Sequence, residues 1–225
     1  MSHSKNSYWI KHSLPLNMFN LEEFKNNLIL EKVVKLNKYL NKNKIDKISK
    51  ILDQFLSLLD HQEFIIPITY ILSILAENKI EFISEQLIKK MESFHHSNNN
   101  KLKINSQIVI GFAMLADPNY LDKYSQEFVE SLLDEFEDIR NNIHYFLPKL
   151  IEKKPVLVKK YLEIILKSLN LENNNNNIIS LLGLFEKYKN FEFDHLYLIR
   201  DELESLLSKI KDKNATKTFK ILITI

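Results

Sequence analysis

Histidine is the residue type in this sequence that most directly suggests chemistry, because the chain has seven histidines and no cysteine. His95 and His96 are adjacent and could ligate a metal ion. Neighbouring residues of a helix point about 100° apart, and no carboxylate follows three or four positions later, so this pair would chelate one ion poorly. We therefore expect the two histidines to lie at a solvated helix end, and we predict no metal site and no cofactor.

Other residue types that could act as nucleophiles or bases occur without a supporting motif. Ser180, His144 and Asp194 are the residue types of a hydrolytic triad, yet no nucleophile motif surrounds the serine. We expect His144 to pack or to face solvent. Without cysteine there is no thiol nucleophile or disulfide, and the only glycines, at positions 111 and 183, are too few for a phosphate-binding loop. The sequence predicts a protein that is not an enzyme.

The charge balance of the chain argues against a dedicated polyanion binder. There are 31 basic and 29 acidic residues, giving a net charge of +2, and every basic residue except Arg140 and Arg200 is lysine. Nucleic-acid-binding proteins usually carry a marked basic excess with arginine at the contacts. A local patch of lysines could still bind nucleic acid, which is therefore the alternative partner.

The elements that must position these residues are helices. Apolar residues recur every three or four positions, as in Ile45 to Leu59, and no segment alternates like a strand. The expected helices are Asn20 to about Asn41, Ile45 to Leu59, Gln62 to Glu77, Ile80 to Phe94, Asn105 to Ala116, Pro118 to Phe136, Glu137 to Lys153, Pro155 to Leu169, Asn176 to Lys189, Phe193 to Lys211 and a last helix from Ala215.

A repeated pattern joins these helices in pairs. An apolar helix end, a short polar turn, an apolar entry residue and a second amphipathic helix recur at intervals of 35, 40, 35 and 35 residues. The anchors are Leu40, Leu75, Leu115, Leu150 and Phe185. A period of this size with one helix pair per unit is typical of an α-solenoid, in which each pair buries its apolar face against its neighbours.

The segment "DEFEDIRNNIHYFLPKLIEKKPVLVKKYLEIILKSL" resembles a HEAT repeat, a family with armadillo and adaptin-like relatives. Asp138 and Arg140 follow an acidic turn that opens helix A, Pro148 lies inside that helix, and Pro155 begins helix B. The resemblance covers about residues 21–211. A tetratricopeptide array is the nearest rival, but its Trp, Leu-Gly, Tyr pattern is absent.

The resemblance implies a ladder of Asp and Arg side chains between successive repeats, and this chain departs from it. Only the fourth repeat has both residues, whereas the third has "NNNKLKINSQ" and the fifth "ENNNNNIIS" at the same place. We interpret the asparagine runs at Asn98–Asn100 and Asn173–Asn177 as loops between helices. The ladder is therefore expected to be largely missing.

Two enzyme classes with HEAT-like folds do not fit the sequence. The iron hydroxylases of this kind use His-Glu dipeptides, and the chain contains none. The alkylpurine DNA glycosylases use a concave surface with aromatic and cationic residues, whereas this chain has one tryptophan and two arginines.

The predicted architecture is all-α: a right-handed α-solenoid of about five HEAT-like helix pairs plus a terminal half repeat. Residues 1–20 form an N-terminal extension that we expect to cap the first repeat through Trp9, or else to dock on another protein, and residues 21–225 form a single domain. The half repeat near the last residue lacks its partner helix, so we expect either a longer natural chain or packing on a partner.

Helix B lines the concave face in the family that the chain resembles, so its polar positions are the expected ligand surface. The candidate partner-binding residues are Lys89, Lys90, Lys123, Lys159, Lys160, Arg200 and, in the extension, Trp9. Lysines such as Lys47 and Lys50 alternate with carboxylates on these helices, and this mixture fits a protein ligand better than a polyanion. Tyr120, Tyr124, Phe128 and Phe136 share a helical spacing and are expected to fill the core.

The function these features imply is a non-enzymatic scaffold or adaptor that presents a curved helical surface to a partner protein or peptide, within a trafficking or coat-like assembly. The alternative is a nucleic-acid-binding solenoid that uses the helix B lysines. No stretch approaches the roughly 18 apolar residues of a membrane span, so we expect a cytoplasmic protein without a membrane span.

Overall fold

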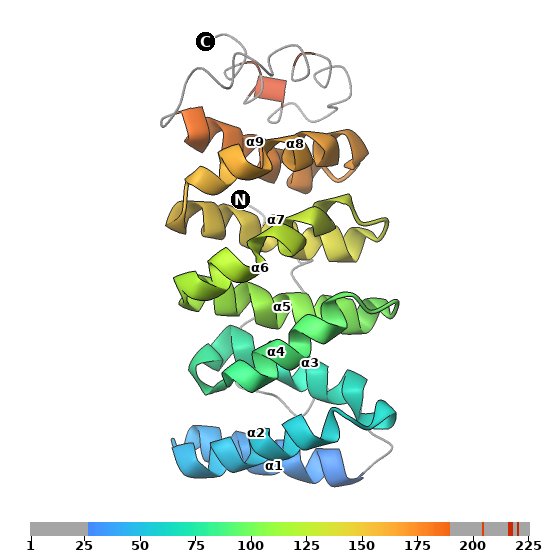
Figure 1. Cartoon of the computed structure of the whole chain (residues 1–225), viewed down its shortest axis with the longest axis vertical. Coiled ribbons are helices and arrows are strands. Elements are labelled where there is room, and N and C mark those ends of the chain that lie inside the picture. Colours follow the sequence, from blue (N-terminus) through green and yellow to red (C-terminus); the bar gives the residue numbers. More distant parts are fainter. Residues whose placement is uncertain (1–26, 190–203, 205–215, 218–219, 221–225) are drawn as a thin grey trace. The chain divides into compact units, whose positions relative to one another are not determined.

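A computed structural model describes residues 27–189, 204, 216, 217 and 220, and within these residues the chain is helical with no strand (Figure 1). The elements in chain order are α1 (Asn27–Asn41), α2 (Ile45–Leu58), α3 (Gln62–Lys79), the 3₁₀ helix η2 (Ile80–Phe82), α4 (Glu85–His95), α5 (Asn100–Ala116), α6 (Pro118–Glu130), the 3₁₀ helix η3 (Ser131–Leu133), α7 (Glu137–Lys153), α8 (Val156–Leu171) and α9 (Asn175–Lys189). The all-α prediction is confirmed for this part of the chain.

Several predicted elements lie outside the described residues. These are the N-terminal extension of residues 1–20, nearly all of the predicted helix from Phe193 to Lys211, and nearly all of the one from Ala215.

The chain divides into two compact units, residues 1–113 and 114–225, with the boundary near the end of α5. In the first unit α1 contacts α2 and α3, and α2 contacts α3 and α4. In the second, α6 contacts α7 and α8, α7 contacts α8 and α9, and α8 contacts α9. In both units, therefore, a helix packs not only on the next helix but also on the one after it. The single domain over residues 21–225 stays a prediction.

The turn between α1 and α2 depends on the backbone conformation of Asn43. Asn43 has a positive φ of 50°, a conformation that asparagine adopts more readily than most residues. The amide of Asn43 donates to the Leu40 carbonyl at 3.1 Å, which closes α1. After this reversal α2 buries Ile48, Leu52 and Phe55 on one face, as its spacing predicts.

The most deeply buried helix segments lie in α3 and α5. Residues 71–76 of α3 and 105–111 of α5 are buried at every position. A helix that is apolar on all sides belongs in a protein interior, and these segments carry only small or amide polar groups. Thr69 and Ser73 satisfy their hydroxyls by donating to the carbonyls of Ile66 and Tyr70.

The helix predicted from Ile80 to Phe94 is wrong at its start. The preceding helix α3 continues to Lys79, residues 80–82 form η2, and α4 begins only at Glu85. Ser84 sets this start, because its hydroxyl accepts a hydrogen bond from the Leu87 amide at 3.4 Å. A serine followed by glutamate is a helix-start signal that outweighs the apolar period before it.

The junction between α6 and α7 is partly as predicted. Helix α7 begins at Glu137 and ends at Lys153, as expected, with Pro148 inside it. However, α6 ends at Glu130 rather than at Phe136. The Asp134 carboxylate accepts a hydrogen bond from the Phe136 amide at 3.0 Å, a local turn that competes with helix. Phe136 is consequently extended, precedes α7, and is 45% exposed.

Candidate functional site

The predicted lysine pair of α4 is divided between two roles. Lys89 is exposed, whereas the Lys90 ammonium donates to the Asp60 carboxylate at 2.7 Å. Asp60 lies in the turn between α2 and α3, so Lys90 ties α4 to that turn. The same hydrogen bond lowers the pKa of Asp60. Of this pair, therefore, Lys90 makes a structural contact, and Lys89 is exposed.

Three other predicted lysines lie in the second unit, on the contacting helices α6 and α8. We call Lys123, Lys159 and Lys160 the lysine surface; all three are exposed. Lys123 lies 4.5 Å from the centroid of the Tyr124 ring and donates to its hydroxyl at 2.8 Å. Lys160 lies 4.9 Å from the centroid of the Tyr161 ring. The tyrosine rings thus hold two of the three ammonium groups by cation–π contacts.

A buried hydrogen bond sets the relative position of these lysines. The hydroxyls of Ser125 and Tyr161 are 2.8 Å apart, and both residues are 1% exposed. Lys123 precedes Ser125 by two residues and Lys159 precedes Tyr161 by two residues. The two lysines therefore occupy equivalent positions on adjacent helices.

Removing the Tyr161 hydroxyl should destabilise the second unit. Tyr161→Phe leaves the buried Ser125 hydroxyl without its partner, and we expect a loss of about 1 kcal/mol in the free energy of unfolding. Urea denaturation followed by circular dichroism would measure it. Ser125→Ala combined with Tyr161→Phe should cost less than the sum of the single changes. Tyr145→Phe, at an exposed tyrosine, serves as the control; a Tyr161→Phe loss no larger than the control's would contradict the assigned bond.

The remaining predicted partner residues, Trp9 and Arg200, lie outside the described residues. The predicted aromatic core is only partly confirmed. Tyr124 and Phe128 are buried, but Phe136 is exposed and Tyr120 is half-buried, stacked on Tyr124 with ring centroids 6.0 Å apart.

A groove between α1 and α2 gathers lysines that the sequence analysis did not group. It has a volume of about 530 Å³ and is lined by Leu28, Glu31, Lys32, Lys35, Tyr39, Lys47, Lys50, Ile51 and Gln54. Lys47 and Lys50 were expected on a polar helix face, but Lys32 and Lys35 on the facing helix were missed. Their spacing along α1 indicated that Lys32 and Lys35 share a helix face. That this face lies against α2 is decided by the packing of the helices and could not be predicted from the spacing.

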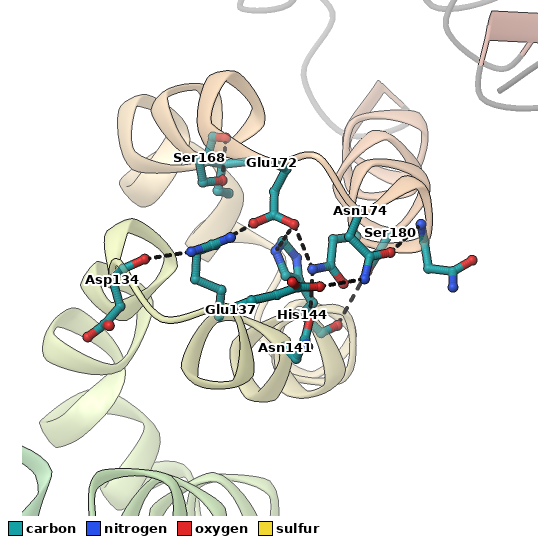
Figure 2. Close-up of polar contacts among 12 residues, drawn as sticks. Asp134, Glu137, Asn141, His144, Ser168, Glu172, Asn174 and Ser180 are labelled. Atoms are coloured by element: carbon teal, nitrogen blue, oxygen red, sulfur yellow. Dashed lines mark hydrogen bonds and ion pairs between the residues drawn. The ribbon is translucent and has the colours of Figure 1, made fainter. Parts of the chain in front are cut away.

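A polar cluster of the second unit surrounds Glu172, in the turn between α8 and α9 (Figure 2). We call it the Glu172 network. The Arg140 guanidinium binds one carboxylate oxygen of Glu172 and also donates to the carbonyls of Asp134 at 2.8 Å and Glu135 at 3.1 Å. The Asn177 amide donates to the other Glu172 oxygen at 2.6 Å. Arg140 thus connects the turn before α7 to the turn before α9.

His144 completes this network from α7. Its Nε2 lies 3.7 Å from the second oxygen of Glu172, a distance suited to an ion pair when the imidazole is protonated. The side chain is 4% exposed, so His144 packs in the interior, one of the two placements expected for it. Ser180 of α9 donates to the His144 carbonyl at 3.3 Å.

Asparagines extend the network, and the interpretation of their runs as loops is only partly confirmed: Asn98, Asn99, Asn173 and Asn174 lie between helices, whereas the last residues of each run are helical. Asn177 donates to the Asn141 side chain at 2.7 Å, and Asn174 donates to the Glu137 carboxylate at 3.0 Å. Helix α9 already begins at Asn175, inside the run. In the earlier run the Asn99 side chain accepts from the amides of residues 101 and 102 at the start of α5. These asparagines cap helices and join them, as their short amide side chains allow.

The Glu172 carboxyl stays ionised under ordinary conditions. Burial by itself raises the pKa of Glu172, but contacts with His144, Arg140 and Asn177 outweigh it and lower the pKa to about 2. General acid–base catalysis works best with a pKa near the operating pH. This carboxylate is therefore suited to holding helices together rather than to moving protons.

The histidine pair at the end of α4 differs from expectation in one respect. His96 is exposed, but His95 is 4% exposed, so the helix end is not fully solvated. His95 follows Ile88 and Met91 by seven and four positions, which places it on the buried face of α4. Among the residues that the structure describes, no three His, Asp or Glu side chains are grouped so that they could hold a metal ion.

In the described ranges every helix is too short or too polar to cross a lipid bilayer. Comparison of the chain with protein-family models, with curated proteins and with solved structures finds no match in any of the three.

Proposed function

We propose that this chain is a non-enzymatic helical-repeat scaffold that presents one helix face to a partner protein. The observation that carries this proposal is a recurring separation of 36 residues between hydrogen-bonded side chains of packed helices. In the first unit Asn105 of α5 donates to Thr69 of α3 at 3.1 Å, 36 positions away. The same separation joins Ser125 to Tyr161 and Asn177 to Asn141 in the second unit.

This separation supports an array of helix pairs of HEAT-like type. Positions 69, 105, 141 and 177 fall on α3, α5, α7 and α9, which would be the A helices of four successive repeats. Positions 125 and 161 fall on α6 and α8, which would be B helices. In a solenoid the same helix position meets its equivalent in the next repeat. About five pairs, a further half repeat and a right-handed superhelix complete the proposed architecture.

The chemistry of the described polar clusters also favours a scaffold. In the Glu172 network both carboxylate oxygens are engaged by residues of neighbouring helices, so the network supplies rigidity. Rigid helices that display side chains can bind a partner at a smaller ordering cost than a flexible segment. Next to Lys123 in the sequence, Asp122 pairs with Lys154, so carboxylates accompany the lysines on α6 and the charge is better matched to a protein than to a polyphosphate.

Partner capture at two salt concentrations tests this proposal. Wild-type chain and the variant Lys123→Glu, Lys159→Glu, Lys160→Glu would be used to retain binding partners from a lysate of the native organism. A discrete protein that the wild type holds at high salt should be lost by the variant. The matched control is Lys38→Glu, Lys101→Glu, Lys153→Glu, three exposed lysines outside the lysine surface that carry the same charge change.

The alternative function, nucleic-acid binding through the same lysines, has a different signature. Affinity would fall steeply with salt, because each phosphate contact releases counterions. Recovery of nuclease-sensitive material at low salt only, dependent on the three lysines, would overturn the protein-scaffold proposal in favour of this alternative.

A further inference from the structure

The basic groove between α1 and α2 carries more positive charge than its own residues neutralise. By basic groove we mean the cleft of about 530 Å³ lined by Lys32, Lys35, Lys47 and Lys50; Glu31 is the only carboxylate among the described residues that line it. Lys35 pairs with Glu31, and Lys32 donates to the Gln54 side chain. Lys47 lies 5.3 Å from the centroid of the Tyr39 ring. Among the described residues no carboxylate pairs with Lys47 or Lys50.

The groove also has apolar groups along its wall and floor. Leu28 is 41% exposed and Tyr39 is half-buried, and both lie on α1. Ile51 of α2, which is 5% exposed, contributes to the floor. Leu28 and Tyr39 are separated by 11 positions, which corresponds to about 16 Å along a helix. An extended peptide covers that distance with about five residues.

We propose that the basic groove binds an acidic extended segment of a partner protein, with carboxylates facing Lys47 and Lys50 and apolar side chains against Leu28 and Tyr39. Charge complementarity carries the choice of occupant: the lining combines two ammonium groups that pair with no described carboxylate and two apolar side chains. This site belongs to the first unit, so it does not depend on the lysine surface of the second unit.

A protein segment fits this groove better than nucleic acid does. Because Lys35 pairs with Glu31, only some of the four lysines are available to bind a continuous row of phosphates. Among the described residues that line the groove the cations are all lysines, which act as point charges; a guanidinium group would bind phosphate in bidentate fashion. A peptide can place acidic and apolar side chains at separate positions, as the lining requires.

Fluorescence anisotropy with the full chain would test this proposal. The probe is a fluorescein-labelled acidic peptide in which consecutive glutamates are flanked by a leucine and a phenylalanine. The double variant Lys47→Glu, Lys50→Glu should raise the Kd for this probe about tenfold or more, because each reversal puts like charges in contact. The matched control, Lys38→Glu, Lys42→Glu, changes two exposed lysines, one in α1 and one in the turn that follows it, that do not line the groove. It should change the Kd by less than about twofold.

Two further arms make the outcome decisive. The neutral variant Lys47→Gln, Lys50→Gln should weaken binding less than charge reversal does, and it serves as the test if the reversed variant loses helicity. A probe with lysine in place of glutamate should bind the reversed variant better than the wild type. Equal Kd values across all variants, or tighter binding of a single-stranded oligonucleotide than of the peptide through Lys47 and Lys50, would overturn the proposal.

Discussion

Leu132→Asp should unfold the second unit, with a loss of about 4 kcal/mol or more in the free energy of unfolding. Leu132 is fully buried in η3, which packs against α6, α7 and α8. The substitution removes apolar burial and places a carboxyl group among apolar helices without a partner. Chemical denaturation would show the loss, and hydrogen exchange would show whether residues 1–113 remain protected when residues 114–225 open.

The neighbouring residue provides a matched control for this prediction. Leu133 belongs to the same 3₁₀ helix but is 38% exposed. Leu133→Asp should therefore cost less than about 1 kcal/mol, the range of most surface substitutions. Equal effects of the two changes, or an unaltered melt for Leu132→Asp, would contradict the packing assigned to η3.

Glu172→Gln should destabilise the second unit by about 3 kcal/mol at neutral pH. The Glu172 side chain is fully buried and Arg140 is 12% exposed, so neutralising the carboxylate leaves a largely buried guanidinium without its counter-charge. Thermal and urea denaturation of the variant and the wild type would measure the difference. Glu163→Gln is the control, because Glu163 is exposed and pairs only with Lys167 of its own helix; it should leave stability nearly unchanged.

The Glu172 carboxylate also makes the difference in stability between the wild type and Glu172→Gln depend on pH. The pKa of Glu172 falls from an ordinary value of 4.5 to about 2 in the folded chain. Between these values the unfolded chain binds a proton that the folded chain does not, so acid favours unfolding. The advantage of wild type over Glu172→Gln should be complete above pH 4.5, shrink as the pH falls, and disappear near pH 2. A difference that stays constant across this window would show that the network does not stabilise the ionised carboxylate.

The sequence predicted helix positions best where local signals agreed. Glu137 was placed correctly because acidic residues open α7 and a Lys-Pro step follows Lys153. The apolar period failed where a short polar side chain offers the backbone another bond. Ser84 and Asp134 are such places, and each bonds an amide within three residues along the chain.

The candidate sites could be predicted from the sequence less completely than the helix positions. The sequence analysis predicts three partner-binding lysines that lie on adjacent helices of the structure: Lys123, Lys159 and Lys160. The structural use of Lys90 was not foreseen, because its partner Asp60 is 30 residues away. The Asp–Arg ladder was expected to be largely missing, but the sequence analysis assigned Arg140 no other partner; Arg140 binds Glu172, a residue of the turn before the next helix.

The sequence by itself determined that the chain forms helices with apolar faces and short polar turns, because helical periodicity and capping are local properties. Only the tertiary structure decided which polar groups become buried together. Asn105 with Thr69, Ser125 with Tyr161, and the Glu172 network all join residues of different helices. A buried polar group is stable only when a partner reaches it, and packing alone brings residues some 36 positions apart within reach.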